Sequence, residues 1–513
     1  MNGAESLIGT LTRGGVTVCF MNPGTSEIHF VAALDRVPAM RGIPCLFEGV
    51  ASGAADGYAR MTGKPACTLL HLGPGLTNAL ANLHNACRAR VPLINIVGDH
   101  ARFHRHYETP LASDIATLAR PHSAWLRSAE SAAEVGRDCA EAIAAARAAP
   151  GGIATLILPA DSAWSDGGAI ADVPPIPAAP LPDEARIAHA AGLMTRRGHV
   201  GLVLGTGLTV GGPLIIAGQI AAKTGAKLLA PFAFTRIERG AGRPPMERIA
   251  YVTDQAIEQL SGYDALILLN ASPPVAFFGH PRKPSVLTAE KTEVFTLSAP
   301  QEDGAGALAA LAERLHAGDA TPALQPQARP QLPTGEITLN GLAAVVGALL
   351  PESAIVIDES ITSGRGMMAA TAGAPPHDWL VNTGGSIGIG MPLAVGAAVA
   401  CPERPVLCLE ADGSGMYTLQ ALWTAARENL RITTVIFANR AYAILKGELV
   451  SAGENPGPKA LDMLEIGRPD IDWVALASGM GVSATKAATL EDFARDLARG
   501  FASCSPTLIE IVV

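Results

Sequence analysis

The chain has 513 residues, of which 49% are hydrophobic and 17% charged, and its formal net charge is −9. This length exceeds what one hydrophobic core supports, so we expect roughly two to four domains. The apolar content excludes a disordered or fibrous chain. The acidic balance, without Lys/Arg blocks, argues against nucleic acid or an anionic membrane surface as a partner.

Two proline-rich stretches divide the chain. Residues 167–183 contain five prolines and residues 317–335 contain four, and neither stretch shows helical or alternating periodicity. Such composition is typical of extended connections between domains. The sequence therefore predicts three domains, over residues 1–166, 184–316 and 336–513.

Each predicted domain alternates short apolar strands with helices, such as the Ala-rich helix expected over 130–149. Continuous apolar strands between helices are typical of parallel sheets covered on both faces. The sequence thus predicts three successive open parallel-sheet α/β domains. The expected strands are 17–20, 66–70, 93–97 and 154–158, then 201–204, 227–229 and 265–269, then 354–357, 406–409, 434–437 and 508–512.

Glu48 is the candidate catalytic acid of the first domain. It stands between the apolar residues 45–47 and the small-residue run 49–60 (GVASGAADGYAR), where we expect a helix over 50–61. A carboxylic acid that shares a proton near neutral pH needs such a dry setting. The alternative is that Glu48 merely caps this helix.

Polar residues follow two neighbouring strands of the third domain. Asp412 comes after the strand at 406–409, and Asn439 comes after the strand at 434–437. The carboxyl ends of parallel strands meet at one rim and bind ligands there, and Mg²⁺ prefers oxygen ligands together with phosphates. We expect Asp412, Asn439 and a backbone carbonyl near Ala441 to hold Mg²⁺ at this rim.

Gly413 and Ser414 are expected to open a helix over 416–428. The free amides at the start of such a helix could hold a phosphate group. The structural alternative is that Asp412 is an N-cap and Asn439 a turn residue, which would require no ligand.

These motifs resemble those of thiamine-diphosphate enzymes. Twenty-five residues separate Gly413 from Asn439, as in that family's GDG-to-N signature, although Ala411 replaces the first glycine. The stretch 48–65 (E-x-x-x-x-x-A-A-D-G-Y-A-R-x-T-G-K-P) is also similar. The resemblance covers nearly the full length, in the order pyrimidine-binding, central and diphosphate-binding domain. It implies thiamine diphosphate and Mg²⁺ as cofactors.

The resemblance implies a role for Glu48 and an oligomer. Glu48 would hydrogen-bond N1′ of the aminopyrimidine, so that the 4′-amino group can remove the proton from C2. Because the expected phosphate clamp lies in the third domain, Glu48 is expected to reach a cofactor held by another subunit. A homodimer is then the minimum unit, and a homotetramer is expected.

Two other segments are expected to touch the cofactor. In the glycine-rich loop 384–392 (GGSIGIGMP), the resemblance implies that the Gly385 carbonyl contacts the aminopyrimidine and that Ile387 keeps the cofactor bent. The alternative for this loop is a simple tight turn. Thr362 and Ser363 follow another strand end and could hydrogen-bond phosphate, or they could simply cap a helix.

Details on the substrate side resemble benzoylformate decarboxylase most. Residues 20–25 (FMNPGT) match its F-x-N-P-G-S loop, which puts Thr25 at the serine position and implies a hydrogen bond to the substrate carboxylate. His71 follows the strand at 66–70, and His280 lies in an FFGHP segment. Both are candidate catalytic histidines, since imidazole suits proton transfer near neutral pH. They could instead be a satisfied strand-end histidine and an exposed loop histidine.

Acetolactate synthase is the competing resemblance. Residues 71–78 (HLGPGLTN) resemble its S-G-P-G-x-T-N segment. The central domain, however, offers only a loose nucleotide-loop match at 205–212 (GTGLTVGG), so FAD is not expected. Residues 442–449 (YAILKGEL), which should border the substrate, match neither enzyme closely.

The sequence therefore predicts a thiamine-diphosphate- and Mg²⁺-dependent, non-oxidative 2-oxo acid decarboxylase or carboligase that works through an enamine. The alternatives are acetolactate synthase and a cofactor-binding subunit without chemistry of its own. Eight cysteines without a Cys-x-x-Cys pair indicate reduced thiols. Residues 1–18 do not look like a signal peptide, and no apolar run reaches about 18 residues. We therefore expect a cytoplasmic protein.

Overall fold

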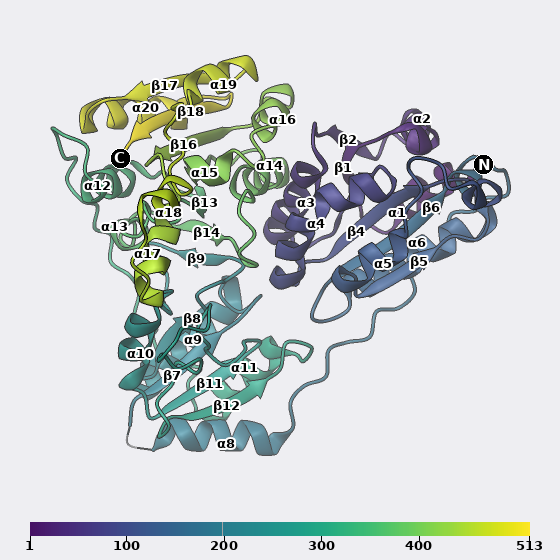
Figure 1. Ribbon diagram of the computed structural model, residues 1–513. Helices are drawn as coiled ribbons and strands as arrows, with labels where there is room; N and C mark the ends of the chain where they lie inside the picture. Colours follow the sequence, from purple (N-terminus) through teal and green to yellow (C-terminus); the bar gives the residue numbers. More distant parts are fainter. Residues whose placement is uncertain (197) are drawn as a thin grey trace.

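The computed structural model describes residues 1–196 and 198–513, and these residues form three sheets (Figure 1). The first sheet is parallel throughout, in the order β2-β1-β3-β4-β6-β5. Successive strand residues alternate between two cores, so α3 and α4 cover one face while α1 and α6 cover the other. The elements are α1 (Gly3–Arg13), β1 (Val18–Asn22), α2 (Ile28–Ala33), β2 (Arg41–Pro44), α3 (Glu48–Thr62), β3 (Ala66–Leu70), α4 (Leu72–Ala89), β4 (Leu93–Asp99), α5 (Ile115–Ala119), β5 (Trp125–Ser128), α6 (Ala132–Arg147), β6 (Ile153–Pro159) and α7 (Ala160–Trp164).

The second sheet is also parallel and runs β10-β8-β7-β11-β12. Helices α8, α9 and α11 share one core with it, and α10 contributes to a smaller core on the other face. The elements are α8 (Glu184–Thr195), β7 (Val200–Leu204), α9 (Gly211–Thr224), β8 (Lys227–Ala230), β10 (Glu247–Arg248), α10 (Thr253–Ser261), β11 (Ala265–Leu269), β12 (Glu293–Ser298) and α11 (Gly304–Arg314).

The third sheet runs β17-β18-β16-β15-β13-β14-β9. Helices α14, α16 and α19 cover one face, and α12 and α20 cover the other. The elements are α12 (Leu339–Leu349), β13 (Ile355–Glu359), α13 (Met367–Ala370), β14 (His377–Val381), α14 (Gly390–Ala400), β15 (Val406–Ala411), α15 (Asp412–Gly415), α16 (Ala421–Arg427), β16 (Ile432–Ala438), α17 (Ala443–Ala452), α18 (Pro458–Asp462), α19 (Trp473–Gly479), β17 (Ser483–Ala487), α20 (Leu490–Ala502) and β18 (Thr507–Val512).

The predicted three-part parallel α/β class is confirmed, with one addition. Strand β9 (Ile237–Arg239) comes from the central segment, yet it pairs antiparallel with β14 of the third sheet. The side chain of Arg236, just before β9, binds Asp378 of β14 at 2.6 Å. A three-residue strand without an apolar run carries no pattern from which this pairing could be predicted.

The helix expected over 416–428 is wrong as one element. The structure has the short α15, then turns, and then α16 (Ala421–Arg427). Two contacts stabilise the break between α15 and α16. The Thr418 hydroxyl donates to the Gly388 carbonyl at 2.8 Å. Gly415 lies so close to Trp473 that a Cβ on Gly415 would be 2.8 Å from Trp473 Cη2.

The small-residue helix α3 is the interface between the first and third domains. Figure 1 shows α3 beside α14, and glycines permit this approach. A Cβ at Gly57 would lie 2.2 Å from the Leu393 carbonyl oxygen, and one at Gly396 would lie 1.9 Å from that of Ala54. The buried Arg60 side chain reaches across to donate to the Val381 carbonyl at 2.7 Å. The small-residue run 49–60 therefore forms the contact between the first and third domains, in addition to forming the helix that Glu48 begins.

The two proline-rich stretches, 167–183 and 317–335, contain no helix or strand in the part of the chain that the structure describes. Figure 1 shows the first of them running as a long connection from the first domain to α8. Among residues 1–196 and 198–513, no helix combines the length and the apolar character that crossing a bilayer requires.

Candidate active site

The ends of β15 and β16 form a rim where polar side chains meet. The two strands pair in parallel up to the last residue of β15. Asp412 is buried there and accepts the backbone N–H of Arg440 at 2.7 Å and that of Gly413 at 2.9 Å. The side-chain carbonyl of Asn439 accepts the backbone N–H of Ala441 at 3.0 Å. Asp412 thus spans the turn that begins at Asn439, which brings both side chains to one rim as expected.

The oxygens at this rim fit a small hard cation. Burial raises the pKa of Asp412, and hydrogen bonds from the backbone N–H groups of Arg440 and Gly413 oppose that rise. A carboxylate, an amide oxygen and a backbone carbonyl are the kinds of ligand that Mg²⁺ takes when phosphates and water complete the octahedron. Among the described residues, no cluster of three or more His, Cys, Asp or Glu side chains offers a closed metal site. A cation at Asp412 and Asn439 would therefore need ligands from a bound phosphate.

Glycines line this rim where side chains would collide. A Cβ at Gly413 would lie 2.8 Å from Tyr442 Cε1, and one at Gly388 would lie 2.5 Å from Tyr417 Cβ. Gly388 has φ +90° and Gly385 has φ +81°, a backbone conformation that favours glycine. The structure thus provides a narrow cradle of backbone at the rim, as close approach to a diphosphate requires. Ser414 is buried beside it.

The glycine-rich loop is fastened to the first domain. The side chains of Asn82 and Asn85 on α4 donate to the Gly388 carbonyl at 3.3 Å and to the Ser386 carbonyl at 2.8 Å. Ile387 lies half-buried between these two carbonyl groups. The loop that carries Gly385 and Ile387 is therefore held from two domains and is more than a simple turn.

Thr362 belongs to the rim, and neither Thr362 nor Ser363 caps a helix. The Asn439 amide donates to the Thr362 hydroxyl at 3.4 Å. Ser363 is buried next to it. The N-cap of the following helix, α13, is Gly366. The helix-capping alternative for Thr362 and Ser363 is therefore wrong.

Glu48 is the first residue of α3 and not its cap. The N-cap is Phe47, and the Glu48 side chain accepts the Asn78 amide at 3.0 Å instead. The residue is 6% exposed. A Cβ at Gly75 would lie 3.2 Å from Glu48 Oε1 and 3.3 Å from His71 Cβ, so Glu48 and His71 flank the same glycine. The capping alternative for Glu48 is therefore wrong, and its side chain is buried.

His71 is paired with a carboxyl group. Its Nδ1 lies 2.8 Å from Glu27 Oε2, which also accepts the Gly24 backbone N–H at 2.8 Å. Burial raises the pKa of Glu27, and the hydrogen bonds from His71 and Gly24 oppose that rise. The pair fixes the imidazole through Nδ1 and leaves Nε2 for another partner. Thr25 is exposed at the start of the same short 3₁₀ turn, Thr25–Glu27.

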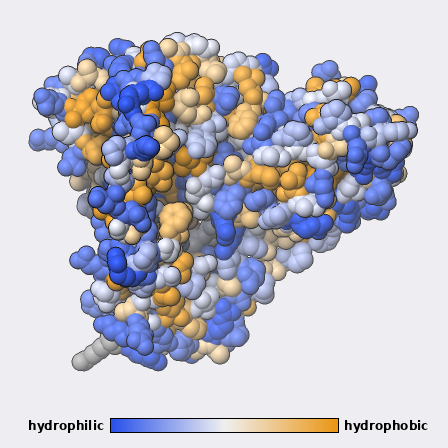
Figure 2. Space-filling view, in the orientation of Figure 1, coloured by the Kyte–Doolittle hydropathy of each residue, from blue (hydrophilic) through white to orange (hydrophobic). Residues whose placement is uncertain are grey.

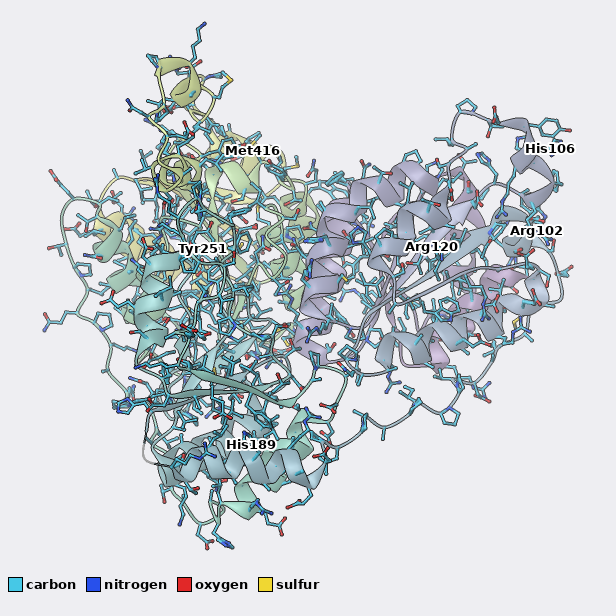
Figure 3. The ribbon with its side chains drawn as sticks, turned by 60° about the horizontal axis from the view of Figure 1, so that its bottom comes forward. Arg102, His106, Arg120, His189, Tyr251 and Met416 are labelled. Carbon is cyan, nitrogen blue, oxygen red and sulfur yellow. The ribbon has the colours of Figure 1, made fainter. Side chains whose placement is uncertain are left out.

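His280 faces the third domain. Its Nε2 lies 3.3 Å from Glu448 Oε2, and its side chain is 14% exposed, so the exposed-loop alternative is wrong. The Tyr251 hydroxyl donates to Glu448 Oε1 at 3.1 Å. In Figure 3, Tyr251 lies where the teal central domain meets the yellow-green third domain.

The candidate residues form two groups within one chain. Glu48, His71 and Thr25 lie in the first domain, whereas Asp412, Asn439 and His280 lie at the third domain and its border. Among the described residues, no hydrogen bond or ion pair joins a member of one group to a member of the other. Four residues that pair with these candidates or with one another were not singled out from the sequence, namely Glu27, Asn78, Tyr251 and Glu448.

Two parts of the chain match known family models. Residues 1–118 match the family "Thiamine pyrophosphate enzyme, N-terminal TPP binding domain", and residues 363–511 match "Thiamine pyrophosphate enzyme, C-terminal TPP binding domain". A Mycobacterium tuberculosis protein named "Putative acetolactate synthase large subunit IlvX" is 55% identical over 515 residues, which cover 100% of this chain and 99% of that protein.

Two decarboxylases are similar over nearly the whole length. Benzoylformate decarboxylase of Pseudomonas aeruginosa is 29% identical over 98% of this chain and 97% of its own. The solved structure of a thiamine diphosphate-dependent 4-hydroxybenzoylformate decarboxylase from Rhodococcus jostii RHA1 superimposes with a TM-score of 0.84 at 26% identity, over 99% of this chain and 98% of the other.

Proposed function

The chain belongs to the thiamine-diphosphate enzyme family, and within that family we propose a Mg²⁺-dependent, non-oxidative decarboxylase or carboligase of 2-oxo acids. The observation that carries this proposal is the buried carboxyl of Glu48, which is bound by Asn78 and does not serve as a helix cap. A subunit that only stored the cofactor would not need this acid. The non-catalytic alternative is therefore not favoured.

Asp412 and Asn439 would hold Mg²⁺ and, through it, the diphosphate, with Thr362, Ser363, Gly413 and Ser414 beside them. The backbone carbonyl of Ala441 would be a third ligand. When bound, thiamine diphosphate supplies an electron sink at C2. The fit of these residues to the cofactor rests on the glycine cradle and the oxygen donors at the rim.

On the reacting side, each residue would have a separate role. Glu48 would hold a proton at N1′ of the aminopyrimidine, and the Gly385 carbonyl and Ile387 would orient that ring. His71, fixed by Glu27 at 2.8 Å, presents Nε2 for proton delivery to the product carbon. Thr25 is exposed and can donate its hydroxyl to the substrate carboxylate.

Because Glu27 fixes His71 as a proton donor, we favour protonation of the product carbon, which would release an aldehyde. A second candidate function is acetolactate synthase, in which the product carbon would be joined to an acceptor carbonyl instead of a proton. The observation that favours it is the 55% identity to the Mycobacterium tuberculosis protein that bears that name. FAD is not part of the proposal.

We propose a homodimer as the minimum unit and a homotetramer as the working assembly, in the cytoplasm. The two groups of site residues lie apart within one chain, and a second copy could bring them together. Each of these two domains also exposes apolar side chains, namely Leu46, Phe103 and Tyr107 in the first and Met416 and Tyr417 in the third. Figure 2 shows hydrophobic residues on the visible faces of both domains. The eight cysteines, all described and all free thiols, support a reducing compartment.

The test is carbon dioxide release from a panel of 2-oxo acids, with thiamine diphosphate and Mg²⁺ supplied and then withheld. Release that needs both cofactors and yields free aldehyde supports the decarboxylase. Release from pyruvate alone, with acetolactate as product, supports the synthase. No release from any member of the panel, despite cofactor binding, would refute the proposed function.

A further inference from the structure

A cavity of about 270 Å³ lies between the central domain and the third domain. Tyr251, Phe277 and His280 line it from the central side, and Thr362 and Glu448 line it from the other. It borders the third-domain part of the proposed cofactor site. Thr362 is the residue whose hydroxyl accepts the Asn439 amide, and a Cβ at Gly385 would lie 2.8 Å from Phe277 Cζ.

Glu448 ties three elements together at the wall of this cavity. It lies on α17, which has no side-chain N-cap and none of whose described side chains is buried. One carboxylate oxygen accepts the Tyr251 hydroxyl, and the other lies 3.3 Å from His280 Nε2. Burial, together with the charge of Glu448, raises the pKa of Tyr251 to about 12, so this hydroxyl remains a donor at neutral pH.

The cationic side chains that line the cavity form no ion pair with Glu448 among the described residues, so its contacts in the central domain are Tyr251 and His280. Lys283 also lines the cavity, but its ammonium group binds Asp254 at 2.8 Å. Arg365 also lines the cavity, and its charge opposes the rise in the pKa of Tyr251, but no ion pair joins it to Glu448 among the described residues. Glu448 therefore accepts the Tyr251 hydroxyl and keeps its other oxygen 3.3 Å from His280 Nε2.

We propose that Glu448 is a positioning residue that sets the tautomer of His280 at the cavity wall, an inference that rests on the proposed function. An ionised carboxylate accepts hydrogen bonds but cannot donate them. Glu448 therefore selects the imidazole form that carries its proton on Nε2. Nδ1 is then the basic nitrogen. When a substrate hydroxyl gives up its proton, Nδ1 takes it and Glu448 stabilises the imidazolium that results.

The structural alternative is that Glu448 only anchors α17 to the central domain, and a set of variants separates the two roles. Glu448→Gln keeps the size of the side chain and can still accept the Tyr251 hydroxyl. Its amide N–H, however, can donate to His280 Nε2 and select the opposite tautomer. We expect kcat to fall by about 100-fold, while KM, thiamine diphosphate affinity and Tm stay near their original values.

The double variant Glu448→Gln/His280→Ala gives the decisive result. Residues that act as one unit show non-additive losses, so the double variant should be no slower than His280→Ala alone. Glu454→Gln is the matched control, because Glu454 is an exposed carboxylate just after α17 without a side-chain hydrogen bond among the described residues. Multiplicative losses, or Glu448→Gln kinetics equal to those of Glu454→Gln, would overturn the proposal.

A readout without substrate separates this inference from the proposed function. Diethyl pyrocarbonate acylates accessible imidazole, and peptide mass spectrometry reports the rate at His280. We expect faster modification in Glu448→Ala than in Glu454→Gln, because the carboxylate that lies 3.3 Å from Nε2 is removed. Equal rates would overturn the inference even if the wild-type protein released no carbon dioxide. An active wild-type protein with equal rates would leave the proposed function standing.

Discussion

Replacing Glu48 with Gln should stop turnover and leave the fold intact. Gln has the same shape, and its side-chain carbonyl can still accept the Asn78 amide that Glu48 accepts at 3.0 Å. The change of acceptor at that hydrogen bond costs about 1 kcal/mol of folding free energy. What Gln cannot do is give or take the proton at N1′.

The expected kinetic loss follows from that missing proton. General acid–base catalysis contributes about 10²–10⁴-fold to a rate, which corresponds to roughly 3–5 kcal/mol in activation free energy. We therefore expect kcat of Glu48→Gln to fall by at least about 100-fold. Thiamine diphosphate should still bind, because Asp412, Asn439 and the glycine cradle remain.

The assay has two parts. Carbon dioxide release from the best 2-oxo acid of the panel gives kcat, and hydrogen–deuterium exchange at C2 of bound thiamine diphosphate reports activation without any substrate. Glu130→Gln is the control, since the Glu130 side chain is 73% exposed and far from Glu48 in the chain. Turnover and C2 exchange near the wild-type rate in Glu48→Gln would refute the assignment of Glu48.

Asp412→Asn should weaken Mg²⁺-dependent binding of thiamine diphosphate, measured by calorimetry with and without Mg²⁺, because one anionic oxygen is lost from the rim; unchanged binding would contradict the proposed metal ligand. Glu27→Gln should lower kcat by about 10-fold or more without changing cofactor affinity, because Glu27 orients His71; a change in affinity alone would count against it. Gly57→Ala should destabilise the protein by about 1–3 kcal/mol, because the new Cβ would lie 2.2 Å from the Leu393 carbonyl oxygen, whereas Gly192→Ala, with open space around it, should not. Burial raises the pKa of Glu359 to about 7 from 4.5. A raised pKa means that the folded state favours the protonated form, so this contribution to stability is present below pH 4.5 and is lost as the pH rises through about 7. Between pH 4.5 and about 7, the Tm of the cofactor-free wild-type protein should therefore fall more than the Tm of Glu359→Gln. Parallel Tm curves for the two proteins would contradict the raised pKa of Glu359.

The sequence by itself determined the fold class and most of the third-domain rim. Apolar strands between helices leave few choices besides parallel sheets covered on both faces. The order of strands then brings the ends of β15 and β16 together. Asp412 and Asn439 follow those ends directly, so their meeting at one rim could be predicted from local positions alone.

Tertiary structure decided everything that depends on side chains from distant segments. Tyr251 and Glu448 are 197 residues apart, and nothing local to either predicts their hydrogen bond. Glu27 lies 44 residues from His71, although an acid two places after Thr25 was a signal that could have been used. The break between α15 and α16 likewise depends on Gly388 and Trp473, which reach it from other elements.

The physical reason is the range of the interactions. Periodicity, turn residues and strand ends record how each residue meets its immediate neighbours, and that information is written locally in the chain. The pairing of α3 with α14, the antiparallel addition of β9 and the partners of His71 and His280 arise only when whole domains pack together. Sequence pattern thus located the candidate catalytic residues, whereas domain packing chose the groups that orient them.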